Sequence, residues 1–137
     1  MVTGLVASIF PDIDLFYSYF ITSHRVKHHD YWTHIPLFWV AVAAISTLFI
    51  KISGKRGLSI YLWVGFSNVM LHMMMDSIAA EIKWLYPFSN WELNLVKIPA
   101  IHHWWVLNFV LHWTFGLEIL IIVIAAFVWI KDQRQPA

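Results

Sequence analysis

Three short segments concentrate histidine and aspartate residues that could together bind a metal ion. The first, PDID, supplies Asp12 and Asp14, and the second, HHDYWTH, occupies residues 28–34. The third, HMMMD, places His72 and Asp76 four residues apart, on one face of a helix. Imidazole and carboxylate groups bind Zn, Mn and Fe. The three segments therefore predict one metal site.

Each segment also has a simpler interpretation when it is taken alone. The aspartates of PDID could cap a helix that begins at Pro11. HHDYWTH could be a solvated loop beneath aromatic side chains, because the spacing of His29 and His34 does not align them on a regular helix. His72 and Asp76 could simply hydrogen-bond to each other. Their combination favours a metal site with these predicted ligands: Asp12, Asp14, His28, His29, His34, His72 and Asp76.

The composition predicts an all-α polytopic membrane protein with a single domain over residues 1–137. The chain is 60% hydrophobic and 12% charged, and it contains nine Trp and ten Phe. A small soluble domain cannot bury so much apolar surface, so a very hydrophobic soluble bundle is the weaker interpretation. We expect about three full spans, at 35–52, 58–81 and 104–130, each containing long uncharged runs.

Shorter elements complete the predicted bundle. The apolar residues 1–10 form a half-helix, and 14–23 form a short interfacial helix. The tight basic loop 51–57 predicts an antiparallel return. The connector 83–103 contains prolines that exclude a continuous helix.

The distribution of Lys and Arg predicts the orientation in the membrane. Five basic residues lie on the side of the loop 51–57 and the C-terminus, and four are spread over the other side. The positive-inside rule therefore places that loop and the C-terminus in the cytoplasm. Almost all candidate ligands then lie near the opposite, outer face.

Several classes of function are excluded by composition. The chain has no cysteine, so it has no disulfide, no thiolate catalysis and no cysteine-ligated zinc. Its net charge of +1 gives no electrostatic footprint for nucleic acid.

The expected partners are membrane lipids and an amphiphilic small molecule. A homodimer is compatible with such a thin bundle.

The order of the motifs over residues 4 to 89 resembles the membrane-bound metal-dependent hydrolases (YdjM-like inner-membrane proteins). PDID is followed by His29-x4-His34 with Thr33 before the second histidine, by His72-x3-Asp76 and by YPFS at 86–89. The resemblance implies an inner-membrane location and functional roles for these residues: Asp12, Asp14, His29, His34, His72 and Asp76.

The sequence departs from that family's pattern at a few positions. Asp30-Tyr31 stands where Arg-Gly is usual, and Ile35 stands where Ser is usual. The family also tends to have a histidine shortly before its first glycine, whereas Met1, Val2 and Thr3 precede Gly4 in this chain. The ligand set is therefore expected to be one residue short.

The resemblance implies a hydrolase that uses a divalent metal ion, with Zn favoured over Mn, Fe or Mg. Asp12 and Asp14 would complete a second metal site or act as general base. A lipid or phosphoester that enters from the outer leaflet is the expected substrate. A non-enzymatic transporter or metal sensor would use the same ligands, and a bis-histidine haem protein would use His72 and His112.

The last span has polar residues of its own. Glu118 is a functional candidate because a carboxylate inside a membrane is costly. Asn108 and His112 lie four residues apart, and hydrogen bonding to another helix is the preferred interpretation of this pair. His102 and His103 are either spare ligands or part of an interfacial anchor.

Overall fold

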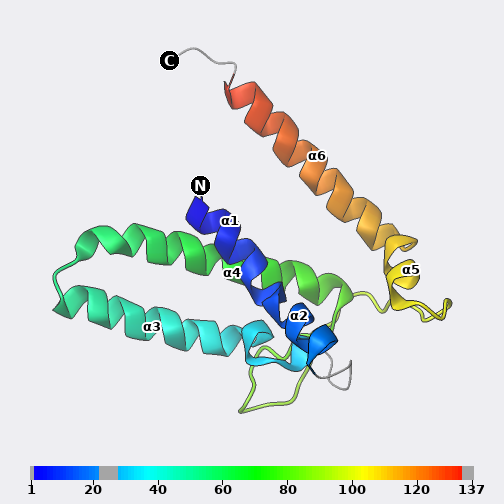
Figure 1. Cartoon of the computed structure of the whole chain (residues 1–137), viewed down its shortest axis with the longest axis horizontal. Helices are drawn as coiled ribbons and strands as arrows, with labels where there is room; N and C mark the ends of the chain where they lie inside the picture. The colour runs from blue at the N-terminus through cyan, green and yellow to red at the C-terminus, as the bar shows by residue number, and fades with distance from the viewer. Residues whose placement is uncertain (1, 22–27, 134–137) are drawn as a thin grey trace. The chain divides into compact units, whose positions relative to one another are not determined.

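The computed structural model is all-α, which confirms the predicted class (Figure 1). It describes residues 2–21 and 28–133, without the side chains of Tyr19, His28, Trp105 and Gln133. The chain divides into two compact units, Met1–Val96 and Lys97–Ala137. Each unit is described by itself below.

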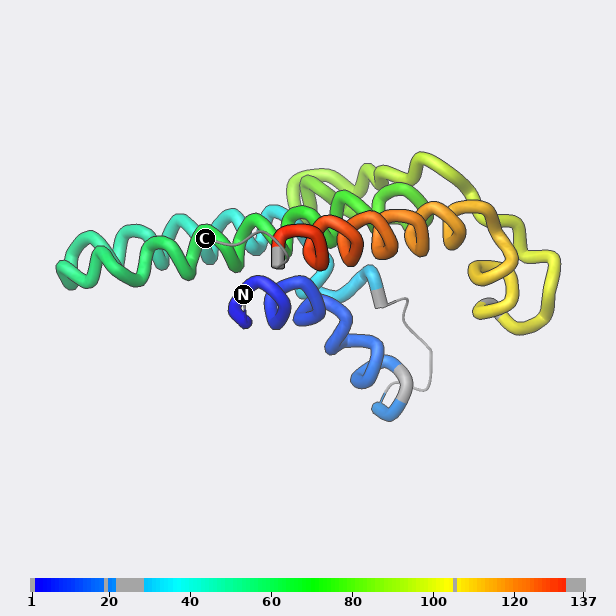
Figure 2. The backbone as a smooth tube through the Cα atoms, turned by 90° about the horizontal axis from the view of Figure 1, so that it is seen from above, coloured from blue at the N-terminus to red at the C-terminus, as the bar shows by residue number. Residues whose placement is uncertain are grey.

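The first unit is built on an antiparallel pair of helices. Helix α3 (Pro36–Ile52) begins at a proline, whose missing N–H suits the first helical turn. It ends before Gly54, whose φ of +68° is a conformation that favours glycine. After the 3₁₀ turn η4 (Arg56–Leu58), helix α4 (Ser59–Ala79) returns beside α3 (Figures 1 and 2). The predicted antiparallel return is therefore confirmed.

Within the described ranges, two helices are long and apolar enough to cross a membrane. They are Arg56–Ala79, which contains α4, and Trp113–Asp132, which lies in α6 (Trp113–Gln133). The 17 residues of α3 rise only about 26 Å, less than the hydrocarbon core of about 30 Å. The sequence predicted about three full spans, and two of them reach the required length.

The second unit differs from the predicted continuous helix over 104–130. Helix α5 (Trp105–Val110) ends before α6 begins at Trp113. The backbone N–H of His102 donates to the side-chain oxygen of Asn108 at 2.6 Å, and the Asn108 amide donates back at 2.9 Å. These bonds tie α5 to the preceding loop.

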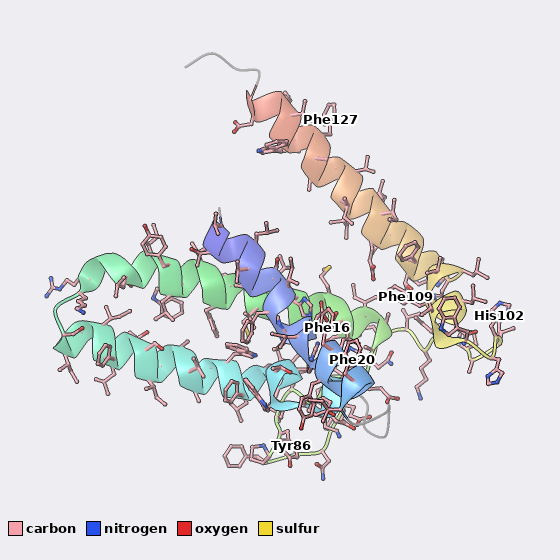
Figure 3. The ribbon with its side chains drawn as sticks, viewed as in Figure 1. Phe16, Phe20, Tyr86, His102, Phe109 and Phe127 are labelled. Atoms are coloured by element: carbon pink, nitrogen blue, oxygen red, sulfur yellow. The ribbon has the colours of Figure 1, made fainter. Side chains whose placement is uncertain are left out.

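The polar pair of the last span therefore makes local contacts. Asn108 lies in α5 and His112 lies in the break before α6, so they do not share one face of a continuous helix. Nδ1 of His112 lies 2.9 Å from Oγ1 of Thr114, two residues away. The predicted hydrogen bonding of Asn108 to another helix was wrong, because its side-chain amide bonds to the backbone of His102 in the loop before α5. Along α6, Phe127 is exposed and points away from the helix (Figure 3).

The N-terminal segment forms two short helices joined by a turn. Helix α1 (Val2–Ile9) is followed by the 3₁₀ turn η1 (Phe10–Asp12) and by α2 (Ile13–Phe20). Helix α1 crosses α4 in close contact (Figure 1). A Cβ atom on Gly4 would lie 3.1 Å from Nδ2 of Asn68, so glycine permits this approach. The contact carries Asp12 towards α4.

Replacing Gly4 with alanine is expected to weaken the contact between α1 and α4. The matched control is Gly65→Ala, because its new Cβ would lie 3.8 Å from Ala7, an ordinary contact. Both changes gain helix propensity, but only Gly4→Ala forces the Asn68 amide to move from its bond to the Val64 carbonyl. Gly4→Ala should be less stable than Gly65→Ala by about 1 kcal/mol. Thermal unfolding in detergent measures the difference, and equal stabilities would contradict it.

The connector after α4 folds back onto the end of that helix. Ile82 and Leu93 form an isolated antiparallel bridge, with N···O distances of 3.1 and 2.9 Å. The amides of Leu95 and Val96 then donate to two carbonyls in the last turn of α4, at 3.0 and 2.8 Å. These bonds satisfy groups that a helix end leaves open. They fix the turn that carries Asp76.

The predicted orientation rests partly on residues outside the described ranges. Arg25, Lys27 and Arg134 are among them. The cytoplasmic placement of the loop 51–57 and of the C-terminus therefore stays a prediction.

Candidate metal centre

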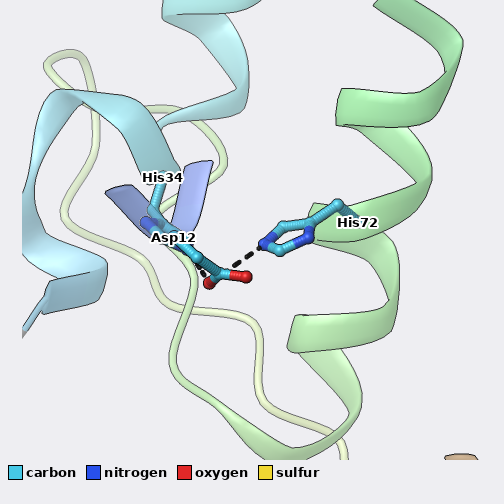
Figure 4. Close-up of side chains that lie close together, drawn as sticks. All are labelled: Asp12, His34 and His72. Atoms are coloured by element: carbon cyan, nitrogen blue, oxygen red, sulfur yellow. Dashed lines mark ion pairs between the residues drawn. The ribbon is translucent and has the colours of Figure 1, made fainter. Parts of the chain in front are cut away.

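The candidate centre lies at the end of the α3–α4 pair opposite the 53–58 turn. Asp12 reaches it from η1, and His34 comes from a 3₁₀ turn, η3 (Trp32–His34), directly before α3. His72 and Asp76 are four residues apart on α4, and their Nε2 and Oδ2 atoms are 3.1 Å apart. The predicted placement of this pair on one helical face is confirmed. Figure 4 shows Asp12 between the imidazoles of His34 and His72.

Four donor atoms meet at this point. Nε2 of His34 lies 3.7 Å from Oδ1 of Asp12 and 3.5 Å from Oδ2 of Asp76. Nε2 of His72 lies 3.5 Å from the same Asp12 oxygen and 3.1 Å from the same Asp76 oxygen. Each nitrogen therefore lies within 3.7 Å of both carboxylate oxygens.

The four nitrogen–oxygen separations of 3.1 to 3.7 Å bracket the range expected of neighbouring ligands around one metal ion. Nitrogen and oxygen ligands at about 2.0 to 2.2 Å from a tetrahedral ion lie about 3.3 to 3.6 Å from one another. Nε2 of His72 and Oδ2 of Asp76 are also buried without a hydrogen bond of normal geometry in the described part of the chain. Buried polar atoms normally have such a bond. Both observations fit a metal ion as the shared partner.

The exposure of the four side chains gives the centre a closed and an open side. The side chain of His34 is 0% exposed and that of His72 is 13% exposed. Those of Asp76 and Asp12 are 24% and 41% exposed. A small molecule would thus approach past Asp12.

Asp14 lies behind His34 rather than among the four converging donors. Its side chain is buried, and Nδ1 of His34 lies 2.6 Å from its Oδ2 atom. The Thr33 hydroxyl donates to the same oxygen. A carboxylate on one imidazole nitrogen commonly directs the other nitrogen to a metal. The sequence predicted Asp14 as a ligand or general base, and the structure places it where it orients His34.

Two supporting residues were given no role from the sequence. Thr33 was visible only as a position in the His29-x4-His34 motif, and its hydroxyl bonds to Asp14. The indole N–H of Trp39 donates to the Thr33 carbonyl at 2.8 Å. Trp39 lies on α3 within a run of apolar residues, so its polar contact had no sequence signal.

The helix-capping interpretation of PDID is not met by Asp12. This residue stands at the N-cap of α2, but its side chain makes no capping hydrogen bond. Its carboxylate instead faces His34 and His72. The position of the Asp12 carboxylate is thus explained by its contacts with the two imidazoles and not by a capping hydrogen bond.

A second histidine of HHDYWTH, His29, lies beside the centre. The segment forms the 3₁₀ turn η2 (His28–Asp30) and then η3, which confirms that it is not a regular helix. The ring of His29 packs edge-on against that of His34, with centroids 4.9 Å apart. Donor atoms of His29, His34 and Asp76 lie within 4.8 Å of one another. The side chain of His28 lies outside the described ones.

Asp30 joins the ligand segment to the connector. Nζ of Lys83 lies 2.6 Å from Oδ1 of Asp30 and 3.6 Å from Oε1 of Glu92. The carboxylate thus has a structural partner of its own, away from the four converging donors.

Charge within the cluster shifts the pKa values of its members. Burial alone would lower the pKa of His34, but the neighbouring carboxylates of Asp12, Asp14 and Asp76 outweigh it and raise the pKa to about 11. Burial would likewise raise the pKa of Asp12, but the neighbouring imidazoles of His34 and His72 hold the pKa below its ordinary value. Without metal, His34 is thus protonated at neutral pH.

Metal binding is expected to release protons. A bound ion needs the lone pair of Nε2, so it must displace the proton that His34 carries below its raised pKa. Metal affinity should therefore rise by at least about tenfold for each pH unit near neutrality. Calorimetric titration with Zn²⁺ in two buffers of different ionisation enthalpy counts the protons. An affinity independent of pH would contradict the assignment of His34.

One of three comparisons with known proteins identifies the family of the chain. No curated protein and no solved structure matches the chain. A family model described as YdjM inner membrane protein matches residues 1–135, well beyond the four motifs that end at residue 89. The chain belongs to the YdjM inner membrane protein family.

Proposed function

We propose that this chain is a membrane-embedded, metal-dependent hydrolase. The observation that carries the proposal is the meeting of four donor atoms from Asp12, His34, His72 and Asp76 at separations of 3.1 to 3.7 Å. Two imidazoles with two carboxylates suit Zn²⁺, and Mn²⁺ and Fe²⁺ are the alternatives. The open side at Asp12 supports a centre that admits water and substrate.

The protein groups would divide the work as follows. A divalent ion, when bound, would lower the pKa of a bound water molecule and polarise a phosphoryl or carbonyl oxygen. Asp14 would keep Nδ1 of His34 engaged, so that Nε2 stays directed into the centre. With the ion held by His34, His72 and Asp76, Asp12, the most exposed of the four, would be the carboxylate best placed to take the proton of an incoming water.

A non-enzymatic metal protein is the second candidate. Four protein ligands around a fully buried imidazole would also suit a transporter or a sensor, which needs no open coordination position. The haem alternative has less support, because Nε2 of His72 faces two carboxylates rather than an open apolar space.

Metal-dependent turnover separates these functions. The purified protein is loaded with Zn²⁺, Mn²⁺ or Fe²⁺ and assayed on aryl phosphates, aryl carboxylic esters and their long-chain analogues. Asp12→Asn should lower turnover by about a hundredfold or more. Asp30→Asn is the control, because Asp30 pairs with Lys83 outside the four donors. A metal-loaded protein without turnover on any of these esters would support the transporter or sensor.

A further inference from the structure

We propose that a groove between α1, α3 and α4 holds the hydrocarbon chain of an amphiphile whose phosphate or carboxylate head group binds at the metal centre. This inference rests on the proposed function, because it names the class of substrate that the same centre would take. It concerns the apolar part of that substrate, about which the four metal-ligand atoms give no information.

The groove is an apolar space of a size suited to a small molecule. Its volume is about 490 Å³, within the range of about 300 to 1,000 Å³ of ligand pockets. Val6 and Phe10 line it from α1 and the turn after it, Val42 from α3, and Leu62 and Phe66 from α4. None of its lining side chains is charged, so it offers no counter-charge to an ionised head group.

One end of the groove adjoins the metal centre. Phe10 stands two residues before Asp12, and Val69 stands three residues before His72. Residues three apart on a helix are neighbours on its surface. A molecule lying in the groove would therefore have one end near Asp12 and His72, although neither residue lines the groove itself.

The other end lies deeper along the membrane helices. Tyr61 lines it from α4, eight residues before Val69, so the groove follows that helix for about 12 Å. Since this direction leads from the ligand end of α4 towards the 53–58 turn, the groove runs along a helix that is long and apolar enough to cross a membrane. Val2 and Val6 on its α1 wall are 75% and 58% exposed, which leaves that side accessible.

These features together favour an amphiphile over a water-soluble ester. A soluble ester would use the open side at Asp12 and gain nothing from the groove. A single hydrocarbon chain would fill an apolar space while its anionic oxygen reached a divalent ion, which prefers oxygen ligands of this kind. The groove would thus hold the hydrocarbon chain of such a molecule, and the adjacent metal centre would hold its anionic head group.

Photo-crosslinking to the Zn²⁺-loaded full chain tests the proposal. The probes are dodecyl phosphate and dodecanoate, each with a diazirine in mid-chain. The expected crosslinks fall on residues of α1 and on 61–69, and removing Zn²⁺ should reduce them about tenfold. The probe with the stronger Zn²⁺ dependence identifies the head group.

Two variants on α3 provide the matched comparison. Val42→Trp places a large ring in the groove, whereas Val40→Trp adds the same ring at a 45% exposed position that does not line it. Val42→Trp should lose most of the crosslinking, and Val40→Trp should keep it. Crosslinks that ignore Zn²⁺ would show ordinary membrane lipid in the groove and overturn the proposal. So would an absence of crosslinks, which another copy of the chain covering the groove would cause.

The outcomes also separate this inference from the proposed function. Turnover of short and long esters at equal rates, without crosslinks in the groove, would leave the hydrolase in place and remove the amphiphile. Zn²⁺-dependent crosslinks without turnover would keep the amphiphile as a ligand and remove the hydrolase.

Discussion

Replacing His72 with alanine is expected to abolish stoichiometric metal binding. Its Nε2 atom lies within 3.5 Å of both carboxylate oxygens of the centre, so the change removes one of four converging donors. Loss of a residue that merely orients a ligand costs about 10- to 100-fold in metal affinity. Loss of a ligand should therefore cost at least about a hundredfold.

Elemental analysis of detergent-purified protein and competition with a chelator dye measure this loss. His112→Ala is the control, because the imidazole of His112 contacts Thr114 in its own unit. The double variant with Asp76→Ala should contain no metal at all. Zn, Mn or Fe retained at wild-type stoichiometry in His72→Ala would remove the metal centre as assigned.

Replacing Asp14 with alanine is expected to weaken metal binding by about 10- to 100-fold without abolishing it. The change removes the acceptor of two buried donors, Nδ1 of His34 and the Thr33 hydroxyl. His34 then loses the contact that directs Nε2 into the centre. Asp14→Asn keeps one acceptor oxygen and should lie between the alanine variant and the wild type.

The same series decides whether Asp14 positions His34 or binds the metal directly. If Asp14 is a positioning residue, its variants should lose only part of the metal affinity. Thr33→Val should then lose less affinity still, because it removes only one hydrogen-bond donor to Asp14. As a direct ligand, both Asp14 variants should lose metal as completely as His72→Ala. Thermal unfolding without metal checks that each variant still folds.

The predictions from sequence were strongest where local spacing determines geometry. The i, i+4 spacing of His72 and Asp76 places them on one face of any helix, and the glycine-containing basic loop requires a tight return. The convergence of PDID with these residues could be suspected from the shared membrane face. It could not be derived, since it depends on how α1 packs against α4 at Gly4.

Other features depend on contacts that leave no pattern in the chain. Hydropathy alone favours one helix over 104–130, but the bonds between Asn108 and the backbone of His102 accompany a break in it. The division of work between Asp12 and Asp14 was equally hidden. Two aspartates two residues apart look equivalent in sequence, but only one of them is buried against the far side of His34.

The four metal-ligand atoms come from segments that lie far apart in a sequence without cysteine, so no disulfide links these segments. Asp12 and Asp76 are separated by 64 residues, so an ion held by both would act as a reversible cross-link between the N-terminal segment and α4. Closing so large a loop removes entropy from the unfolded chain, as a disulfide would. The supply of metal would then determine the stability of the first unit as well as its chemistry.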